Sequence, residues 1–501
     1  MGKIKSTNVP FPEWVTSHKK PGTEIKFING KYYLYGVRSV YDKTIKRARK
    51  ISLGIVGSIT EKDGFIPSSK NKLREEASRS YAGKQVFSVE YGYAKWLVSC
   101  IDQDGTLQRI KNCFPELWQF IVAMVYCRTA YQSKLKNIPF HLLHSDLCAL
   151  LGWDEKLSDQ KVCDYLFALG GQLSSIHKYM EPEHKDKKSV LVDATDIVSH
   201  SQNLEIAKKG YNSKMDFNTQ FVLLYLYDAT TLQPLYYRIL PGNIREITAF
   251  KNTIAASGIE HCIFMADKGF YSESNISEME NCGLQYIIPL KRGNKLVPYK
   301  ELADIELGDN HFQYAKRHVF YADQITTEQG RTVCLFLDGM LKEQEKNDYL
   351  SRIKTLPEYY SKEKFKEKVN KMGTLAIIHN TELDSEEIYQ EYKQRGNIEQ
   401  FFDHLKNTLD ASSSCMQREE SLNGWMFINH ISMQVIYKLY KILKTTPLNK
   451  KQTLNHKYSI MDSIDHLKTI KKVKFTNTEY IITEADKATR ILLEKMSIDI
   501  T

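Results

Sequence analysis

Long hydrophobic runs are absent from this sequence, and so is the apolar N-terminal stretch of a secretory signal. The longest apolar runs, such as Phe221 to Tyr227, have the length of a β-strand. We therefore expect a cytoplasmic protein that has no part in a membrane.

Paired cysteines are also lacking. Nine cysteines are scattered along the chain, and no two of them have CxxC spacing. Neither a zinc site nor a disulfide framework is indicated, and the isolated thiols fit a reducing compartment.

The charge excess is modest. There are 70 Lys and Arg residues against 60 Asp and Glu residues, a net charge of +10. This balance is compatible with a polyanionic partner, although many proteins of this size are mildly basic without one. The 501 residues exceed what one core usually holds, so we expect several modules.

The first module predicted is a β-rich region over residues 1–105. Two strand-like runs, Glu24 to Ile28 and Lys31 to Tyr35, flank Asn29-Gly30, which is a strong hairpin signal. A basic stretch follows, Lys43 to Lys50. It fits a solvated strand or loop as well as it fits a contact with DNA phosphates.

A helical pattern then covers residues 106–185, a possible DNA-binding region. Within it, Ser145 to Leu151 and Ser158 to Leu169 stand on either side of Gly152 and could form a helix-turn-helix. Short helix pairs are common, so an ordinary packing role is the stronger alternative.

Alternating strands and helices make residues 186–290 the first part of an α/β core. Strands are predicted at Ser189 to Val192, Thr219 to Tyr227 and Leu235 to Leu240, then a helix over Ile247 to Ser257. Two more strands, Cys262 to Ala266 and Leu284 to Leu290, flank a short helix. This succession is typical of a layered α/β sheet.

Three further segments complete the chain. Residues 291–372 read as an inserted β-rich subdomain with a charged helical stretch, and residues 373–440 return to the core. Asp384 and Glu387 form a capping-box pattern that starts a helix there. Residues 441–501 are Lys-rich and mainly helical.

Two acidic residues stand directly after buried apolar strands, Asp193 and Asp267. Side chains at strand ends are held rigidly and face a crevice, which suits reactive groups. Each residue alone is as easily explained as a turn former or a helix cap.

A third polar set lies in the segment YKQRGNIEQFFDHLK. On one continuous α-helix, its four members would share an arc of about 60° beside a separate apolar stripe. Gly396-Asn397 could kink that helix, and a solvated charged face would show the same periodicity. The four residues are Tyr392, Arg395, Glu399 and Lys406.

The spacing of these four residues, Y-x2-R-x3-E-x6-K, resembles the signature of a large group of bacterial insertion-sequence DDE transposases. Four other segments are similar to that group. They are VDATD at Asp193, PGNIRE at Pro241, ADKGFYSESN at Ala266 and SLNGWMFINH at Ser421. The likeness covers about residues 186–435.

The resemblance implies an RNase H-like catalytic core, which the predicted strand succession also fits. It implies that Asp193, Asp267 and Glu399 hold two Mg2+ ions, with Mn2+ as a possible substitute. Asp196 and Asp403 are the substitutes if one ligand is misassigned. The reaction implied is cut-and-paste transposition: nicking at the ends, a hairpin intermediate and strand transfer to target DNA.

The resemblance also implies partners. Arg395 and Lys406 would bind phosphates, Tyr392 would contact the terminal phosphate or stack on a base, and Lys268 is a weaker phosphate contact. Double-stranded DNA with terminal inverted repeats and a target DNA are the expected substrates, with a homodimer near the bacterial nucleoid. Two alternatives stay open: an RNase H-like nuclease without strand transfer, and a DNA-binding protein that no longer cuts.

Overall fold

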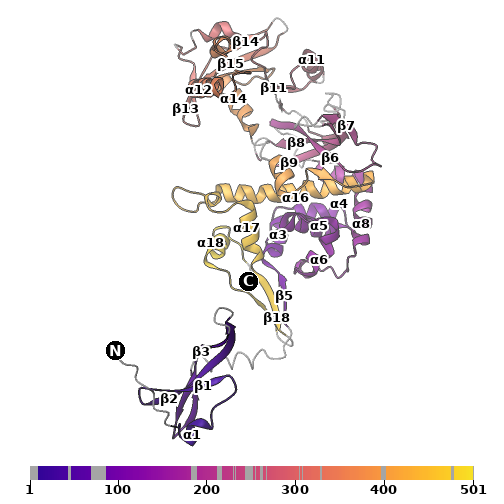
Figure 1. The fold of residues 1–501 in the computed structure, drawn as a ribbon. Coiled ribbons are helices and arrows are strands. Elements are labelled where there is room, and N and C mark those ends of the chain that lie inside the picture. The colour runs from indigo at the N-terminus through magenta and orange to yellow at the C-terminus, as the bar shows by residue number, and fades with distance from the viewer. Residues whose placement is uncertain are drawn as a thin grey trace, which may run out of the picture. The chain divides into compact units, whose positions relative to one another are not determined.

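The computed structural model of this chain describes most of its residues, and it divides them into two compact units (Figure 1). The described residues are 10–42, 47–68, 86–181, 189–211, 217–228, 231, 233–242, 252–253, 255–259, 263–266, 268–281, 283–303, 305–306, 308–327, 330–396, 402–475 and 479–499. The first unit holds residues 1–87 and 474–479, and the second holds residues 88–473 and 480–501. Within this described part, every helix is too short or too polar to span a bilayer.

The first unit is a four-stranded antiparallel meander with the order β1-β2-β3-β4. It contains α1 (Glu13–Thr16), β1 (Thr23–Ile28), β2 (Lys31–Asp42), β3 (Arg47–Thr60) and β4 (Gly64–Pro67). The predicted hairpin is confirmed: Asn29 and Gly30 both have positive φ, and Ile28 pairs with Lys31. A small core closes the unit around Val15, Ile25, Leu34 and Ile59.

The second unit begins with a layer of helices. They are α3 (Gly92–Gln103), α4 (Thr106–Cys113), α5 (Trp118–Tyr131), α6 (Ile138–Leu143), α7 (Leu147–Leu150), α8 (Asp159–Gly171) and α9 (Leu173–Met180). The first helix of the possible helix-turn-helix is therefore a single turn, α7, because Gly152 takes a positive φ just after it. The second helix, α8, is present as expected and begins at the N-cap Ser158.

A long helix, α16 (Glu419–Thr445), lies between these helices and the large sheet (Figure 1). It packs on α5 and α8 on one side and on β9 on the other. Two glycines, Gly170 on α8 and Gly424 on α16, let the helices α8 and α16 approach closely. A Cβ at either position would run into backbone atoms of the other helix.

The sheet of the second unit has a mixed α/β arrangement around one long strand, β6 (Ser189–Ser199). On one side, β8 (Phe217–Asp228) pairs antiparallel with β6, and β9 (Pro234–Pro241) and β7 (Lys208–Tyr211) pair antiparallel with β8. On the other side, β10 (Ile263–Met265) is parallel to β6, and β11 (Gln285–Pro289) is parallel to β10. The strands predicted for the first part of the core are thus confirmed.

Two other expectations for this region have different outcomes. The helix predicted at Ile247 to Ser257 lies largely outside the described residues. The described positions within it, 252–253 and 255–257, are helical. The strand predicted to end at Val192 continues to Ser199. Its polar side chains interrupt the apolar run, but the backbone ladder with β8 extends to Val198 regardless.

The strands of residues 291–372 extend this same sheet, in the order β12-β13-β15-β16-β11-β10-β6-β8-β7. They are β12 (His311–Tyr314), β13 (Arg317–Tyr321), β14 (Ile325–Thr326) and β15 (Thr332–Asp338), and β16 (Thr374–His379) joins them to β11. Three helices accompany them, α11 (Glu273–Asn281), α12 (Gly339–Thr355) and α13 (Lys362–Lys368). The predicted insertion is therefore continuous with the core through hydrogen-bonded strands.

The C-terminal region combines helices with two strands. It contains α17 (Ile460–Lys468), β18 (Lys471–Phe475), β19 (Tyr480–Ile482) and α18 (Lys487–Lys495). The strands form a small sheet with β5 (Val86–Glu90) in the order β19-β18-β5. The expectation of a mainly helical region missed these strands, because both are short and β18 is rich in lysine.

Candidate active site

Asp193 lies within β6, where β8 pairs with one edge of its backbone, two residues beyond the last described pair between β6 and β10. Its register partner on β8 is Tyr225, and its side chain is half-buried. The carboxylate Oδ1 accepts a hydrogen bond from the backbone N–H of Ala194 at 2.8 Å. Asp193 is thus held in the middle of a strand, whereas the sequence predicted that it would follow the end of one.

The second predicted ligand, Asp267, lies outside the described residues. Its neighbours on the N-terminal side are described: β10 runs parallel to β6, with Met265 paired to Leu191. In the sequence, Asp267 follows Met265 by two positions, just as Asp193 follows Leu191. Lys268, the next residue, is exposed.

The signature segment begins on α14 (Ser385–Gln394). The predicted capping box is confirmed, since the Asp384 side chain accepts from the N–H of Glu387 and the Glu387 side chain accepts in return. Tyr392 is half-buried near the end of this helix and packs against the main core. Arg395 follows at the C-cap.

Arg395 reaches the first candidate ligand. Its Nη2 atom lies 3.7 Å from Oδ2 of Asp193, and the two side chains are 17% and 28% exposed. The Nε–H of Arg395 is buried and has no hydrogen-bond acceptor among the described residues. The pair brings the signature segment to β6 although the two are far apart in the sequence.

The other end of the segment also meets this part of the sheet. The ring of Phe402 lies edge-on to Tyr225 at 6.3 Å and to Tyr227 at 6.4 Å between centroids. A π-helical turn follows, His404–Thr408, with Leu405 buried and Lys406 half-buried. Both flanks of residues 397–401 are therefore positioned near Asp193.

These observations correct the expected helical row. A π-turn holds Lys406, so the regular 100° spacing does not extend to this residue. A π-turn contains an extra residue, which rotates the following side chains relative to a regular helix. Glu399, the third predicted ligand, lies outside the described residues.

Buried aromatic residues pack between β8, which pairs with β6 at Asp193, and α16. Tyr225 stacks on His430 of α16 at 5.9 Å and 19°. Burial raises the pKa of the Tyr227 hydroxyl well above its usual value, with smaller contributions from Tyr225, Tyr437 and Asp193. Burial lowers the pKa of His430 to about 3, so this imidazole is neutral at physiological pH.

The two substitute carboxylates have other surroundings. Asp196 is three residues along the same strand, so it lies on the opposite face of β6 from Asp193. Its Oδ1 accepts from Nε2 of Gln220 at 3.3 Å. Asp403 is exposed and accepts from the side chain of Asn407. Groups of three or more His, Cys, Asp or Glu side chains that could hold a metal are absent from the described residues, which exclude Asp267 and Glu399.

A buried arginine on α5 was missed by the sequence reasoning. Arg128 donates to the carbonyl of Leu409, to that of Ser133 at 3.2 Å and to Oδ1 of Asn429 at 3.1 Å. Its guanidinium lies over the ring of Trp425 at 4.4 Å. Burial lowers its pKa to about 10. One charged residue in a helix whose other residues are uncharged and mostly apolar is the signal that could have identified it.

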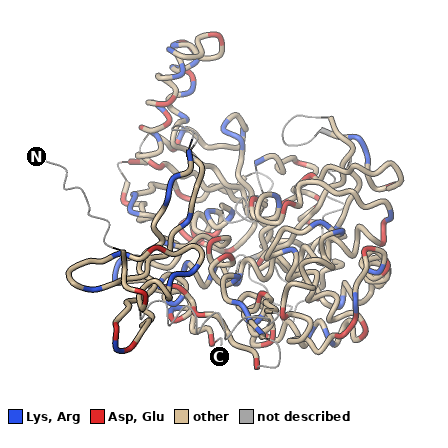
Figure 2. The backbone as a smooth tube through the Cα atoms, turned by 60° about the horizontal axis from the view of Figure 1, so that its bottom comes forward, with Lys and Arg blue, Asp and Glu red and all other residues tan. Residues whose placement is uncertain are grey.

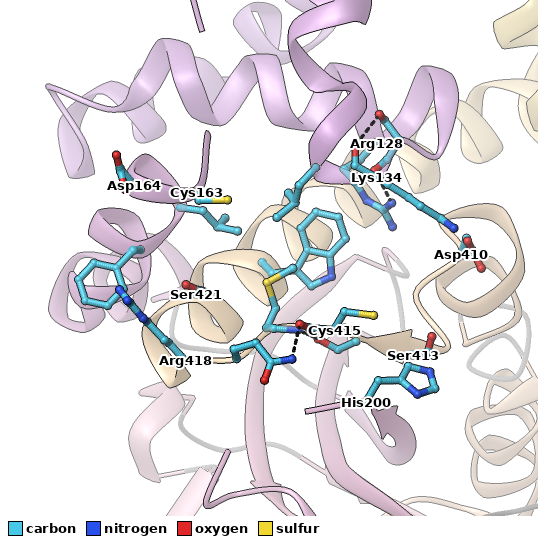
Figure 3. A pocket seen from close by; sticks show the side chains of 18 of the residues that line it. Arg128, Lys134, Cys163, Asp164, His200, Asp410, Ser413, Cys415, Arg418 and Ser421 are labelled. Atoms are coloured by element: carbon cyan, nitrogen blue, oxygen red, sulfur yellow. Dashed lines mark hydrogen bonds between the residues drawn. The ribbon is translucent and has the colours of Figure 1, made fainter. Parts of the chain in front are cut away.

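Arg128 lines a cavity of about 760 Å3 beyond the far end of β6. Figure 3 shows Arg128, Lys134 and Asp410 on one side of it, and Cys163, Asp164 and Arg418 on the other. His200 and the strand β17 (Ser413–Ser414), which pairs with the end of β6, also line it. Asp193 and the signature residues Tyr392, Arg395 and Lys406 do not line this cavity.

Residues 184–434, half of the chain, match the family model described as transposase DDE domain. The chain therefore belongs to the family of transposases with a DDE domain. It is a DNA transposase, and enzymes of this family use divalent metal ions.

Among solved structures, the chain is similar to the piggyBac transposase synaptic complex with hairpin DNA, determined by cryo-EM. The likeness covers 70% of each chain at 9% identity, with a TM-score of 0.38, so it is distant. No curated protein sequence matches this chain.

Proposed function

We propose that this transposase works by the cut-and-paste route of the bacterial insertion-sequence group with the Y-R-E-K signature. Asp193, Asp267 and Glu399 are its catalytic carboxylates. The observation that carries this proposal is the 3.7 Å approach of Arg395 to Asp193, because it joins the signature segment to the first acidic motif.

The flanks of the signature segment support the assignment of Glu399. Glu399 stands four residues after Arg395 and three before Phe402. Arg395 contacts Asp193, and Phe402 contacts Tyr225, which is the register partner of Asp193. These two flanking contacts support Glu399 as the third carboxylate of the proposed site.

The strand register supports Asp267 and an RNase H-like core in the same way. The order β11-β10-β6-β8-β9, with β6, β8 and β9 antiparallel and β10 and β11 parallel to β6, supports an RNase H-like core. The described register ends at Met265 paired with Leu191, each two residues before a proposed ligand, which supports Asp267 as the partner of Asp193.

The proposed donor set fits a hard divalent cation. Three carboxylates supply the oxygen ligands that Mg2+ prefers, and the observed carboxylate, Asp193, is only half-buried and so remains reachable. When bound, two Mg2+ ions, or Mn2+ in their place, would activate a water and stabilise charge on the leaving oxygen.

The chemistry is a series of phosphoryl transfers. Water attacks a phosphodiester at the element's end, and the bond to the 3′-oxygen breaks, which frees a 3′-hydroxyl. That hydroxyl then attacks a phosphodiester of the opposite strand, giving a hairpin, and after hairpin opening attacks target DNA. Each attack forms one P–O bond and breaks another.

The basic residues of the signature would bind the DNA near the cut. Arg395 offers a two-pronged donor beside Asp193, and its Nε–H, without an acceptor among the described residues, leaves a place for a phosphate oxygen. Lys406 would act as a point charge, Tyr392 would contact the terminal nucleotide, and Lys268 is exposed for a further phosphate contact. We further propose a homodimer on paired terminal inverted repeats, near the bacterial nucleoid, because cutting both ends of the element needs two active sites.

The test is cleavage of the DNA that flanks the gene by purified protein with Mg2+, in parallel with Asp193→Ala and with EDTA. We expect nicks at the element's ends that disappear in the variant and in EDTA. Joining of the freed 3′-hydroxyl to a plasmid target separates transposition from hydrolysis alone. Cuts without joining would favour a nuclease, and binding without cuts in Mg2+ or Mn2+ would favour a protein that only binds DNA.

A second test addresses Glu399. Glu399→Gln should abolish cleavage and leave end binding nearly unchanged, since it removes a ligand charge but little volume. Glu382→Gln, at an exposed position before α14, is the matched control and should cleave normally. Loss of end binding in Glu399→Gln would assign Glu399 a structural role instead.

A further inference from the structure

Part of the first unit is a two-stranded ribbon that no other strand supports. The strand β1 pairs with β2 only up to Gly36, and β4 pairs with β3 only from Gly57 onward. Beyond the facing glycines Gly36 and Gly54, β2 and β3 continue as a pair, with bulges at this point. We call residues 37–42 and 47–53 the arm. Residues 43–46 lie outside the described residues and are no part of the argument.

The arm is exposed on both faces. All residues from 47 to 53 are exposed, and so are Arg38 and Tyr41. Large apolar side chains are among them: Tyr41 is 62% exposed and Leu53 is 65% exposed. An isolated two-stranded ribbon is only marginally stable in water, so an arm of this kind is suited to gain order on a partner.

Its arginines are gathered on one face. The register pairs Arg38 with Ile51 and Val40 with Arg49, so that Arg38, Arg47 and Arg49 share one face by strand alternation, and it pairs Arg47 with Asp42. Among the described residues, none of these three arginines has an ion-pair partner. Lys50 is on the other face, where it lies 3.6 Å from Glu24. Figure 2 shows Lys and Arg positions in blue on both strands of this ribbon.

We propose that the arm is a DNA-binding element that enters a groove of the duplex and places Arg38, Arg47 and Arg49 against it. This inference rests on the proposed function only in taking duplex DNA as the substrate, and it concerns a surface apart from the carboxylates.

Charge and dimensions favour DNA over other occupants. The arm contains four basic residues, Arg38, Arg47, Arg49 and Lys50, and one acidic residue, Asp42. Its strands are about 5 Å apart, and the major groove of DNA, about 12 Å wide, admits such a ribbon. Six residues of each strand extend about 20 Å, which spans several phosphates on one strand. A second copy of the same cationic face would repel this one.

The experiment measures binding of the full-length protein to a random-sequence duplex of about 30 bp by fluorescence anisotropy, at salt concentrations from about 50 to about 300 mM. The variant Arg38→Gln/Arg47→Gln/Arg49→Gln should lower affinity on the order of a hundredfold at about 0.1 M salt. The slope of log affinity against log salt should become shallower by about 2.7, or about 0.9 per lost phosphate contact.

Two further variants make the result specific. Replacing the same three arginines by lysine keeps the charge and should keep the slope. The matched control, Lys19→Gln/Lys20→Gln/Lys62→Gln, removes three exposed charges elsewhere in this unit and should change the slope by less than about 1. Equal slopes for the arginine-to-glutamine variant and the wild type would overturn the proposal. So would equal losses in that variant and in the control, or an altered oligomeric state with unaltered DNA binding.

The proposed function can fail independently. The salt slope of binding and the cleavage of flanking DNA are separate measurements, so each proposal has its own readout. An arm variant that keeps wild-type binding, in a protein that still cuts, would therefore overturn the arm and leave the carboxylates as assigned.

Discussion

A buried carboxyl at the start of the helical layer gives a prediction whose size follows from the structure. Glu90 is 6% exposed, and its Oε1 accepts from the N–H of Tyr93 at 2.7 Å, which caps α3. Its Oε2 accepts from the hydroxyl of Tyr126 at 2.5 Å. Burial outweighs these hydrogen bonds and raises the pKa of Glu90 from 4.5 to about 7.

The sign of the effect follows from the two pKa values. Between pH 4.5 and about 7, the unfolded chain releases this proton and the folded protein keeps it. The stability contributed by protonated Glu90 is therefore full below 4.5 and is lost as the pH rises through 7. The gap corresponds to about 3 kcal/mol, from 1.36 kcal/mol per pH unit.

The perturbation is Glu90→Gln, which keeps the acceptor for Tyr93 and removes the charge. The variant should be more stable than the wild type by about 3 kcal/mol at pH 8 and nearly equal to it at pH 4.5. For a unit of about 400 residues, this is a Tm difference of about 4 °C at pH 8. Differential scanning calorimetry at the two pH values measures it.

The control for Glu90→Gln is a variant that removes an exposed carboxylate. Glu116→Gln removes one negative charge at an exposed position of the same unit and reports the general effect of charge on Tm. A Tm difference between Glu90→Gln and the wild type that is the same at pH 4.5 and pH 8 would show that Glu90 is not protonated in the folded protein.

Three other predictions follow from particular contacts. Arg128→Met leaves the carbonyl of Leu409 without its donor and should cost about 3 kcal/mol of unfolding free energy, seen as a lower Tm; an unchanged Tm would contradict it. Gly424→Ala should cost about 1–3 kcal/mol because a Cβ there meets the backbone of α8, whereas Gly171→Ala, which meets nothing, is the control. Arg395→Gln should slow end cleavage on the order of a hundredfold while DNA binding in gel shifts changes little; equal loss of both would make Arg395 only a binding residue.

Local patterns predicted the elements whose causes are local. The turn at Asn29-Gly30 needs only two residues that tolerate positive φ, and the capping box at Asp384 needs only a side chain three positions on. The buried part of β8, Phe221 to Tyr227, is apolar without interruption because both of its faces are covered. These were all recognised from the sequence.

Elements that depend on distant partners were missed or misjudged. Apolar periodicity ended the strand at Val192, but pairing with β8 extends it to Ser199. The strand β17 has only two residues and exists because it pairs with the end of β6. Residues 291–372 were predicted to be a separate insertion because their sequence pattern differs from that of the core. In the structure, β15 and β16 join them to the core by backbone hydrogen bonds. Hydropathy carries no information on such pairing.

The signature segment shows both limits together. Treating it as one regular helix predicted an aligned row of four side chains, and the structure instead ends α14 at Gln394 and inserts a π-turn before Leu409. The fixed spacing was nevertheless informative, because a spacing can describe residues that meet through an irregular backbone as well as through a regular one. Arg395 meets Asp193 before residues 397–401, which lie outside the described part, and Phe402 meets Tyr225 after them. Because Lys406 lies in a π-turn, regular helical periodicity is the wrong measure of its direction, and the contacts on the two flanks carry the information instead.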